Sequence, residues 1–263
     1  MVVRLMRYKV IASGVSDIGR VRQNNEDVWI ALPEFGLYCL ADGMGGHQAG
    51  EIAAREAVNA LCRIVKKKRG FKKDALSLED VKHGVQYAIE QVNLEVFKMS
   101  RLHQELRGMG TTLCCLLFHE KGVVYANVGD SRIYRLRGQK MEQITTDHSL
   151  LREMIELGQL REEQATDFLY KNIITKAIGT EPKVEPAVKA NEVQVDDQYL
   201  ICSDGLSDLL TSAEIAKVMI ESSSIHDSVN QLVAIANQRG GHDNITVVIA
   251  KVEKYNEKED LSR

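Results

Sequence analysis

The sequence contains few prolines and few aromatic residues, and it has no long hydrophobic run. Three prolines in 263 residues predict an ordered chain with one irregular connection near Pro182 and Pro186. No apolar run approaches the ~20 residues that a membrane span needs. The first ten residues lack the apolar stretch and cleavage site of a signal peptide. We therefore expect a cytoplasmic protein with no membrane partner.

Cysteine pairs and strong net charge are also missing. None of the five cysteines forms a CxxC pair, and the adjacent Cys114 and Cys115 would point to opposite sides of a strand. Reduced core thiols are therefore expected, rather than a disulfide framework or a zinc site. The net charge of -3 provides no positive field for nucleic acid. The basic run at residues 66–73 is short and is expected to be a solvated loop. We expect a monomer.

The order of the elements predicts an α+β fold. Periodicity predicts helices at residues 48–67, 212–221 and 227–239, and a further helix opened by the capping box Ser77-x-x-Asp80. Four strands with short connections are typical of an antiparallel meander: 112–118, 123–128, 131–136 and 141–145. Other strands are expected at 8–13, 27–31, 36–41, 173–175, 198–203 and 244–252. Grouped strands and grouped helices favour antiparallel sheets over alternating βαβ units.

Four aspartates share one setting, because each lies where a short apolar strand meets glycine or a tight turn: Asp42, Asp130, Asp204 and Asp243. A carboxylate at the end of a buried strand is costly unless something compensates it, and several at one sheet edge repel one another. Divalent cations would solve both problems. Oxygen ligands without a matching histidine or cysteine set favour Mg²⁺ or Mn²⁺. One such aspartate alone would indicate only a turn or helix cap.

A glycine-rich loop follows the first of these aspartates, with the sequence Asp42-Gly-Met-Gly-Gly-His-Gln-Ala-Gly50. A dinucleotide site would need G-x-G-x-x-G, but the last glycine of that pattern falls on Gln48. No GxxxxGK[ST] segment is present, which excludes a P-loop. We interpret the loop as backbone that approaches a metal closely, with the Gly43 carbonyl available to bind it.

Upstream of this loop lies the segment Arg22-Gln-Asn-Asn-Glu26-Asp27. Beside an acidic metal site, the planar fork of an arginine can bind a phosphate through two hydrogen bonds. A surface arginine paired with Glu26 or Asp27 is an equally good interpretation of this segment taken alone.

Eight segments in order, over about residues 8–252, resemble bacterial members of the PP2C-type (PPM) family of metal-dependent protein phosphatases. They are Arg22-Gln-Asn-Asn-Glu-Asp27, Ala41-Asp-Gly-Met-Gly-Gly-His47, Gly110-Thr-Thr112, Val128-Gly-Asp-Ser-Arg132, Thr146-Asp-His-Ser149, Ile174-Thr-Lys-Ala-Ile-Gly179, Cys202-Ser-Asp-Gly-Leu206 and Asp243-Asn-Ile-Thr246. The resemblance implies a four-layer αββα sandwich of two antiparallel sheets flanked by helix pairs. The phosphatase domain would span residues 1–253, followed by a polar tail at 254–263.

The resemblance also implies a ligand set for two metal ions, with a third and weaker one. Asp42 would bridge two ions, and the Gly43 carbonyl would bind one of them. Asp204 and Asp243 would complete the ligands of the other. Asp130 would share a third ion with Asp204.

The remaining roles implied by the resemblance concern the substrate and water. Glu26 and Asp27 would hold metal-bound waters, and Arg22 would bind the substrate phosphate. Many eukaryotic members have a histidine directly after Asp-Gly, proposed as the general acid, where this chain has Met44, which cannot donate a proton. His47 is nearby, but a structural role in the loop fits it as well, so the acid stays unassigned.

By this resemblance the protein is a serine/threonine phosphoprotein phosphatase that uses Mn²⁺ or Mg²⁺. It would hydrolyse phosphomonoesters by direct attack of a metal-activated water and reverse a bacterial Ser/Thr kinase on phosphoserine and phosphothreonine proteins. Residues 150–171, broken at Gly158, match the mobile flap beside the active site. Two alternatives remain: an inactive regulatory domain, which should have lost metal aspartates, and a nucleotide-binding module.

Overall fold

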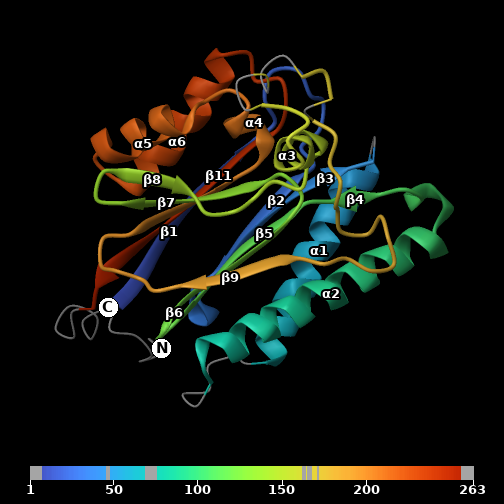
Figure 1. Cartoon of the computed structure of the whole chain (residues 1–263), viewed down its shortest axis with the longest axis horizontal. Coiled ribbons are helices and arrows are strands. Elements are labelled where there is room, and N and C mark those ends of the chain that lie inside the picture. Colours follow the sequence, from blue (N-terminus) through green and yellow to red (C-terminus); the bar gives the residue numbers. More distant parts are fainter. Residues whose placement is uncertain are drawn as a thin grey trace.

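Two antiparallel sheets form the middle of the molecule in the computed structural model, which describes residues 8–45, 48–68, 76–161, 164, 168–170 and 172–255 (Figure 1). The first sheet contains β1 (Tyr8–Asp17), β11 (Ile245–Lys254), β10 (Gln198–Cys202), β7 (Arg132–Arg137) and β8 (Lys140–Gln143), in that order. The second contains β2 (Asp27–Leu32), β3 (Leu37–Met44), β5 (Leu113–His119), β6 (Gly122–Val128) and β9 (Ala187–Asn191), with β4 (Gly110–Thr111) paired to β3.

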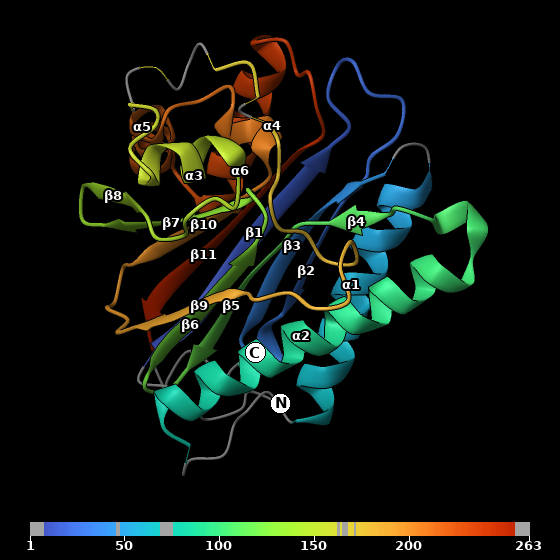
Figure 2. The same ribbon diagram turned by 45° about the vertical axis from the view of Figure 1, so that its right-hand side comes forward.

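Helix pairs cover the outer faces of the two sheets (Figures 1 and 2). Helices α1 (Gln48–Lys67) and α2 (Leu78–Leu102) lie on the second sheet, and α5 (Ser212–Glu221) and α6 (Ile225–Gln238) lie on the first. The shorter helices are α3 (Leu150–Glu156), α4 (Asp204–Ser207) and the 3-10 turns η1 (Pro33–Phe35) and η3 (Gln104–Leu106). Among the described residues, no helix is long and apolar enough to cross a membrane.

Three apolar layers separate the two sheets and the two helix pairs, and the alternation of side chains along each strand builds them. In β5, Cys115 and Leu117 pack against α1 and α2, whereas Cys114, Leu116 and Phe118 pack between the sheets. A third cluster fills the space under α5 and α6 and contains Leu200, Val247 and Ile249. Because successive side chains of a strand face opposite ways, one apolar strand contributes to two layers. The predicted αββα sandwich is therefore confirmed, and all five cysteines are buried and free.

Local signals set the helix ends as the sequence predicts. The Ser77 side chain accepts a hydrogen bond from the Asp80 N–H (3.1 Å), and the Asp80 carboxylate accepts one from the Ser77 N–H (2.8 Å). This reciprocal pair satisfies two N–H groups that would otherwise lack partners at the start of α2. The helix predicted at residues 48–67 has the same bounds as α1.

The predicted four-stranded meander is wrong. Strands β5 and β6 form a hairpin in one sheet, and β7 and β8 form a hairpin in the other. The chain crosses between the sheets at residues 129–131, where Gly129 has a φ of 99°. A short connection shows that two strands are near neighbours, but it does not show whether they share hydrogen bonds.

Three smaller differences concern the second half of the chain. No strand forms at residues 173–175, where Ile174 makes only an isolated bridge to Ser149. Strand β9 is not predicted, because it is only half-buried and lacks a clear alternation. Helix α3 ends before Gly158, and residues 162–163, 165–167 and 171 of the expected flap lie outside the described residues, as do 69–75 and 256–263.

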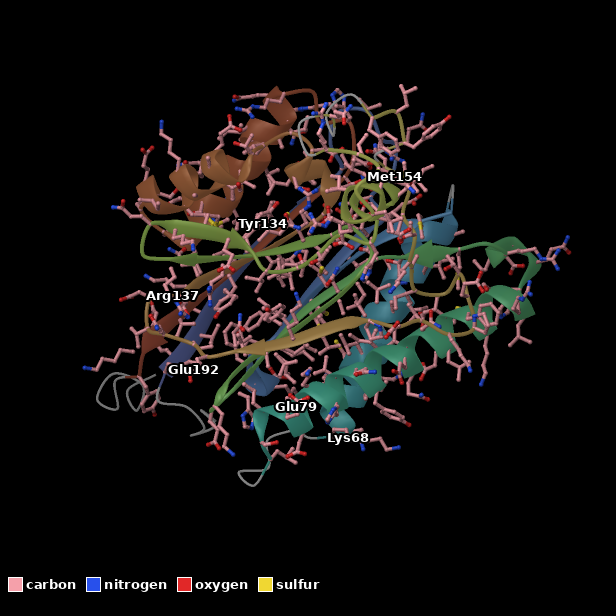
Figure 3. All side chains as sticks on the ribbon, viewed as in Figure 1. Lys68, Glu79, Tyr134, Arg137, Met154 and Glu192 are labelled. Atoms are coloured by element: carbon pink, nitrogen blue, oxygen red, sulfur yellow. The ribbon has the colours of Figure 1, made fainter. Side chains whose placement is uncertain are left out.

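Polar contacts tie the two sheets together where β7 and β9 finish (Figure 3). Arg137 Nη2 donates to the Glu192 carbonyl (3.1 Å) beyond β9 and to Asp197 Oδ2 (2.7 Å) before β10. In Figure 3 this contact lies far from Met154 on α3, so α3 marks the opposite end of the sandwich.

Candidate active site

The sequence-predicted acidic residues of the second sheet meet at the end of the sandwich near α3. Asp27 begins β2 and lies directly across from Asp42 near the end of β3. The antiparallel register then places the beginning of β5 and the end of β6 at the same end, since Leu113 pairs with Val128. Asp130 follows two residues later.

The first sheet brings its own carboxylates to the same place. Cys202, at the end of β10, pairs with both Arg132 of β7 and Val247 of β11. Asp204 follows β10 as the first residue of α4, and Asp243 precedes β11. Figure 2 shows α4 beside α3 at this end. Two sheets therefore contribute carboxylates to one site, although the residues come from opposite ends of the chain, from Asp27 to Asp243.

Burial and mutual repulsion act on these carboxylates. Burial, followed by the charges of Asp27 and Asp204, holds the pKa of Asp42 well above its ordinary value. Burial, followed by Asp130 and Asp243, does the same to the pKa of Asp204. Burial also raises the pKa of Asp130 to about 6. Burial and the neighbouring negative charges oppose ionisation of these carboxylates, so added positive charge would stabilise the cluster.

Divalent cations fit this cluster. The Oδ1 atoms of Asp27 and Asp204 are buried, with no hydrogen-bond partner within the described structure. A buried carboxylate oxygen without a partner is costly, and a hard cation is the kind of group that oxygen ligands of this sort bind. Within the described ranges, no group of three or more His, Cys, Asp or Glu side chains is arranged so that it could hold a metal ion. The argument for a cation at this cluster is therefore the negative charge of the clustered carboxylates and their unpaired oxygens.

Asp27 is held from the first sheet, although it belongs to the second. Its Oδ2 atom accepts hydrogen bonds from Ser203 Oγ (2.8 Å) and Thr246 Oγ1 (2.7 Å). Burial raises the pKa of Asp27 to about 7, and these two hydroxyl donors oppose part of that rise. Ser203 precedes Asp204, and Thr246 follows Asp243 by three positions, so Asp27 links the two acidic strand ends.

Arg22 reaches the cluster from the loop before β2. Its Nη2 atom donates to Asp243 Oδ2 at 2.6 Å, and both side chains remain partly exposed. The alternative pairing with Glu26 or Asp27 is not the one formed: the guanidinium binds an acidic residue of the site itself.

Glu26 lies where β3 passes the start of α1. The Gly43 N–H donates to the Glu26 carbonyl (3.1 Å), and a side chain on Gly43 would overlap the backbone of Gly50. A side chain on Gly50 would in turn overlap the Glu26 carboxylate. Gly43 and Gly50 are therefore required for close packing, and this packing holds Glu26 beside Asp42.

Comparison with known proteins agrees with this geometry. Residues 19–246 match the family model described as protein phosphatase 2C. The serine/threonine phosphatase stp of Listeria innocua is 36% identical over 239 residues, which cover 90% of this chain and 93% of that protein. The chain belongs to the PP2C family of serine/threonine protein phosphatases.

Solved structures of PP2C-family phosphatases superpose on this chain. The Streptococcus agalactiae serine/threonine phosphatase has a TM-score of 0.84 at 35% identity, covering 93% of this chain and 100% of that one. The catalytic domain of the phosphatase PstP, solved with two manganese ions, has a TM-score of 0.80 at 33% identity, covering 94% and 99%. Metal dependence is accordingly a property of this family.

Several polar residues that hold the PP2C site together have no role predicted from the sequence. Asn244 is buried; its Nδ2 donates to the carbonyls of Ile18 (3.0 Å) and Asn24 (2.9 Å), and its Oδ1 accepts from the Glu26 N–H (2.8 Å). It therefore fastens the loop that carries Arg22 to the start of β11. Asn244 stands in the quoted motif Asp243-Asn-Ile-Thr, which was its only signal in the sequence.

Thr112 links the two halves of the cluster. Its Oγ1 accepts from the Asp42 N–H (2.9 Å) and lies 2.7 Å from Ser131 Oγ, next to Asp130. The Thr111 hydroxyl donates to the Asp42 carbonyl (2.9 Å). The backbone of Asp42 is thus clamped by two neighbouring threonines of the Gly110-Thr-Thr112 motif. His47 lies outside the described residues.

Proposed function

We propose that this chain hydrolyses phosphoserine and phosphothreonine in proteins with divalent ions held by Asp42, the Gly43 carbonyl, Asp204 and Asp243. Asp130 is proposed to hold a further ion together with Asp204. The observation that supports this proposal is the gathering of these carboxylates from two sheets into one half-buried cluster, where burial and mutual repulsion raise the pKa of Asp42 and of Asp204. We propose two ions, with a third more weakly held, and either Mn²⁺ or Mg²⁺ suits such oxygen ligands.

When bound, the ions would activate a water molecule for attack on phosphorus and neutralise charge on the phosphate oxygens. The chain's own residues orient the groups that take part. Glu26 and Asp27 are proposed to accept hydrogen bonds from water at the cluster, and Asp27 is itself fixed by Ser203 and Thr246. Attack in line with the leaving serine or threonine oxygen needs no residue as nucleophile.

Arg22 is the proposed phosphate-binding residue. Its bond to Asp243 uses one terminal nitrogen, which leaves donors of the guanidinium fork for a phosphate. The positive charge of the Arg22 guanidinium would also balance the negative charge that develops on the equatorial oxygens of the phosphate. Met44 at the end of β3 cannot donate a proton, so no side chain is assigned to protonate the leaving group.

The experiment measures release of p-nitrophenol from p-nitrophenyl phosphate. Activity should require added Mn²⁺ or Mg²⁺ and vanish with EDTA. Asp42→Ala and Asp204→Ala should each abolish turnover while circular dichroism stays native, because a ligand is lost and the apolar layers are not. Full activity after exhaustive chelation, or wild-type kcat in either variant, would refute the proposed metal site.

The proposed partners are phosphoproteins and a Ser/Thr kinase whose products this enzyme dephosphorylates. We propose that the chain acts as a monomer, since the site is built from one chain. Phosphoproteomics of a strain carrying the Asp204→Ala variant would identify the substrates as the phosphosites whose occupancy rises.

A further inference from the structure

A cleft of about 470 Å³ lies between the β7–β8 sheet edge and α3. Gln143, Thr145 and Asp147 line it from the sheet side, and Leu151, Arg152 and Ile155 line it from α3. The proposed metal ligands do not line this cleft, so it is distinct from the site described above.

The cleft adjoins the acidic site. A narrower pocket of about 60 Å³ contains Asp130 and Asp204, and its walls include Asp147, Ser149 and Leu151, which also line the cleft. A peptide whose phosphorylated residue reached the carboxylates could therefore place a nearby side chain beside α3.

The charges that line the cleft are compensated within the protein. Arg132 donates to both carboxylate oxygens of Asp147, at 2.9 Å and 3.1 Å from Nε and 2.6 Å from Nη2. Gln143 also donates to Asp147, at 2.8 Å. Arg152 pairs with Glu156 at 2.9 Å. A charged side chain of a substrate would compete with these internal pairs for a partner.

The apolar side of the cleft is incompletely covered. Helix α3 has no buried residue, although four of its seven residues are apolar. Leu151 and Ile155 are one helical turn apart and face the cleft together. Both side chains are only half-buried, so a ligand that covered them would remove apolar surface from water.

We propose that this cleft is a specificity subsite that takes an aliphatic side chain, such as leucine, near the phosphorylated residue of the substrate. This inference rests on the proposed function, because the occupant is part of the phosphoprotein being dephosphorylated. Leu151 and Ile155 would be the specificity-determining residues.

The test uses the Mn²⁺-loaded full chain and phosphothreonine peptides that carry Leu, Glu or Lys at one flanking position and alanine elsewhere. One flanking position should show a kcat/KM about tenfold higher with Leu than with Glu, as expected for partial burial of an aliphatic side chain. In Ile155→Asn, and separately in Leu151→Asn, that ratio should fall toward one. Ile155→Leu should retain it.

The matched control is Leu157→Asn, at the end of the same helix, where the side chain is 71% exposed and does not line the cleft. It should keep both the preference and the activity. Equal kcat/KM for all peptides, a preference for Glu or Lys, or an unchanged preference in folded Ile155→Asn and Leu151→Asn would overturn the subsite. If no peptide is dephosphorylated at all, the proposed function itself fails.

Discussion

Arg22 couples the exposed loop before β2 to the acidic cluster through Asp243. We predict that Arg22→Ala raises KM for p-nitrophenyl phosphate and lowers kcat/KM, because a charged hydrogen-bond partner of a phosphate contributes roughly 2–4 kcal/mol to transition-state binding. Steady-state kinetics measure this, with Arg22→Lys as the comparison that keeps charge but loses the fork. The Mn²⁺ concentration for half-maximal activity should change less than KM. An unchanged kcat/KM would make Arg22 a surface residue only.

Asn244 acts on the same loop from the opposite side. Asn244→Ala removes three hydrogen bonds to backbone groups of residues 18–26. We predict a loss of about 2–4 kcal/mol in the free energy of unfolding, together with a higher KM, since Arg22 and Glu26 lose their support. Denaturant unfolding and kinetics measure the two effects. Asn230→Ala, on the exposed face of α6, should change stability by no more than about 0.5 kcal/mol. A normal KM in Asn244→Ala would contradict the positioning role.

At the scale of elements, α3 is the least anchored helix near the site. Its base is held by a hydrogen bond from the Gly129 N–H to His148 Nδ1 (3.2 Å) and by the bridge between Ser149 and Ile174. None of its own residues is buried. Elements with few buried contacts open locally before the core does.

We therefore predict that shortening or exchanging residues 150–171 changes activity on phosphoproteins much more than activity on p-nitrophenyl phosphate. The small ester needs only the cluster and Arg22, whereas a phosphoprotein can also contact α3. Amide hydrogen exchange should be faster in α3 than in β3 and β10. Parallel loss of both activities would instead make the segment part of the catalytic scaffold.

Some elements are determined by residues close together in the sequence, and others by pairing between distant segments. Helix α1 and the Ser77–Asp80 capping box could be predicted from local periodicity and capping. The pairing of β7 with β10, rather than with β6, could not, because Cys202 and Arg132 meet only through hydrogen bonds between distant strands. The same limit explains the missed β9, whose pairing with β6 outweighs its weak local pattern.

At the scale of the whole molecule, repulsion among the clustered carboxylates opposes folding, and bound cations would relieve it. We predict that Mn²⁺ raises Tm by several degrees, since ligand at about a hundred times Kd contributes ~2.7 kcal/mol. Asp204→Ala should lose this rise, and without metal it should be at least as stable as the parent chain because one repelling carboxylate is gone. Calorimetry measures both.

Glu192→Ala is the control for this experiment, because Glu192 is exposed and lies far from α3 (Figure 3). It should keep the full Mn²⁺-dependent rise. A Tm that is insensitive to Mn²⁺ in the parent chain, or a full rise in Asp204→Ala, would contradict metal binding by the cluster.

The sequence by itself determined the family, the layered α+β architecture and the acidic residues that meet at one end, because ordered local motifs and strand-end aspartates carry that information. Their roles as metal ligands stay predictions. Tertiary structure alone decided that Arg22 binds Asp243, that Asn244 ties the Arg22 loop to β11, and that a half-apolar cleft opens beside Asp147. The first two depend on contacts between residues distant in the chain, and the cleft depends on how α3 packs beside the β7–β8 edge; neither local propensity nor periodicity encodes which groups will meet.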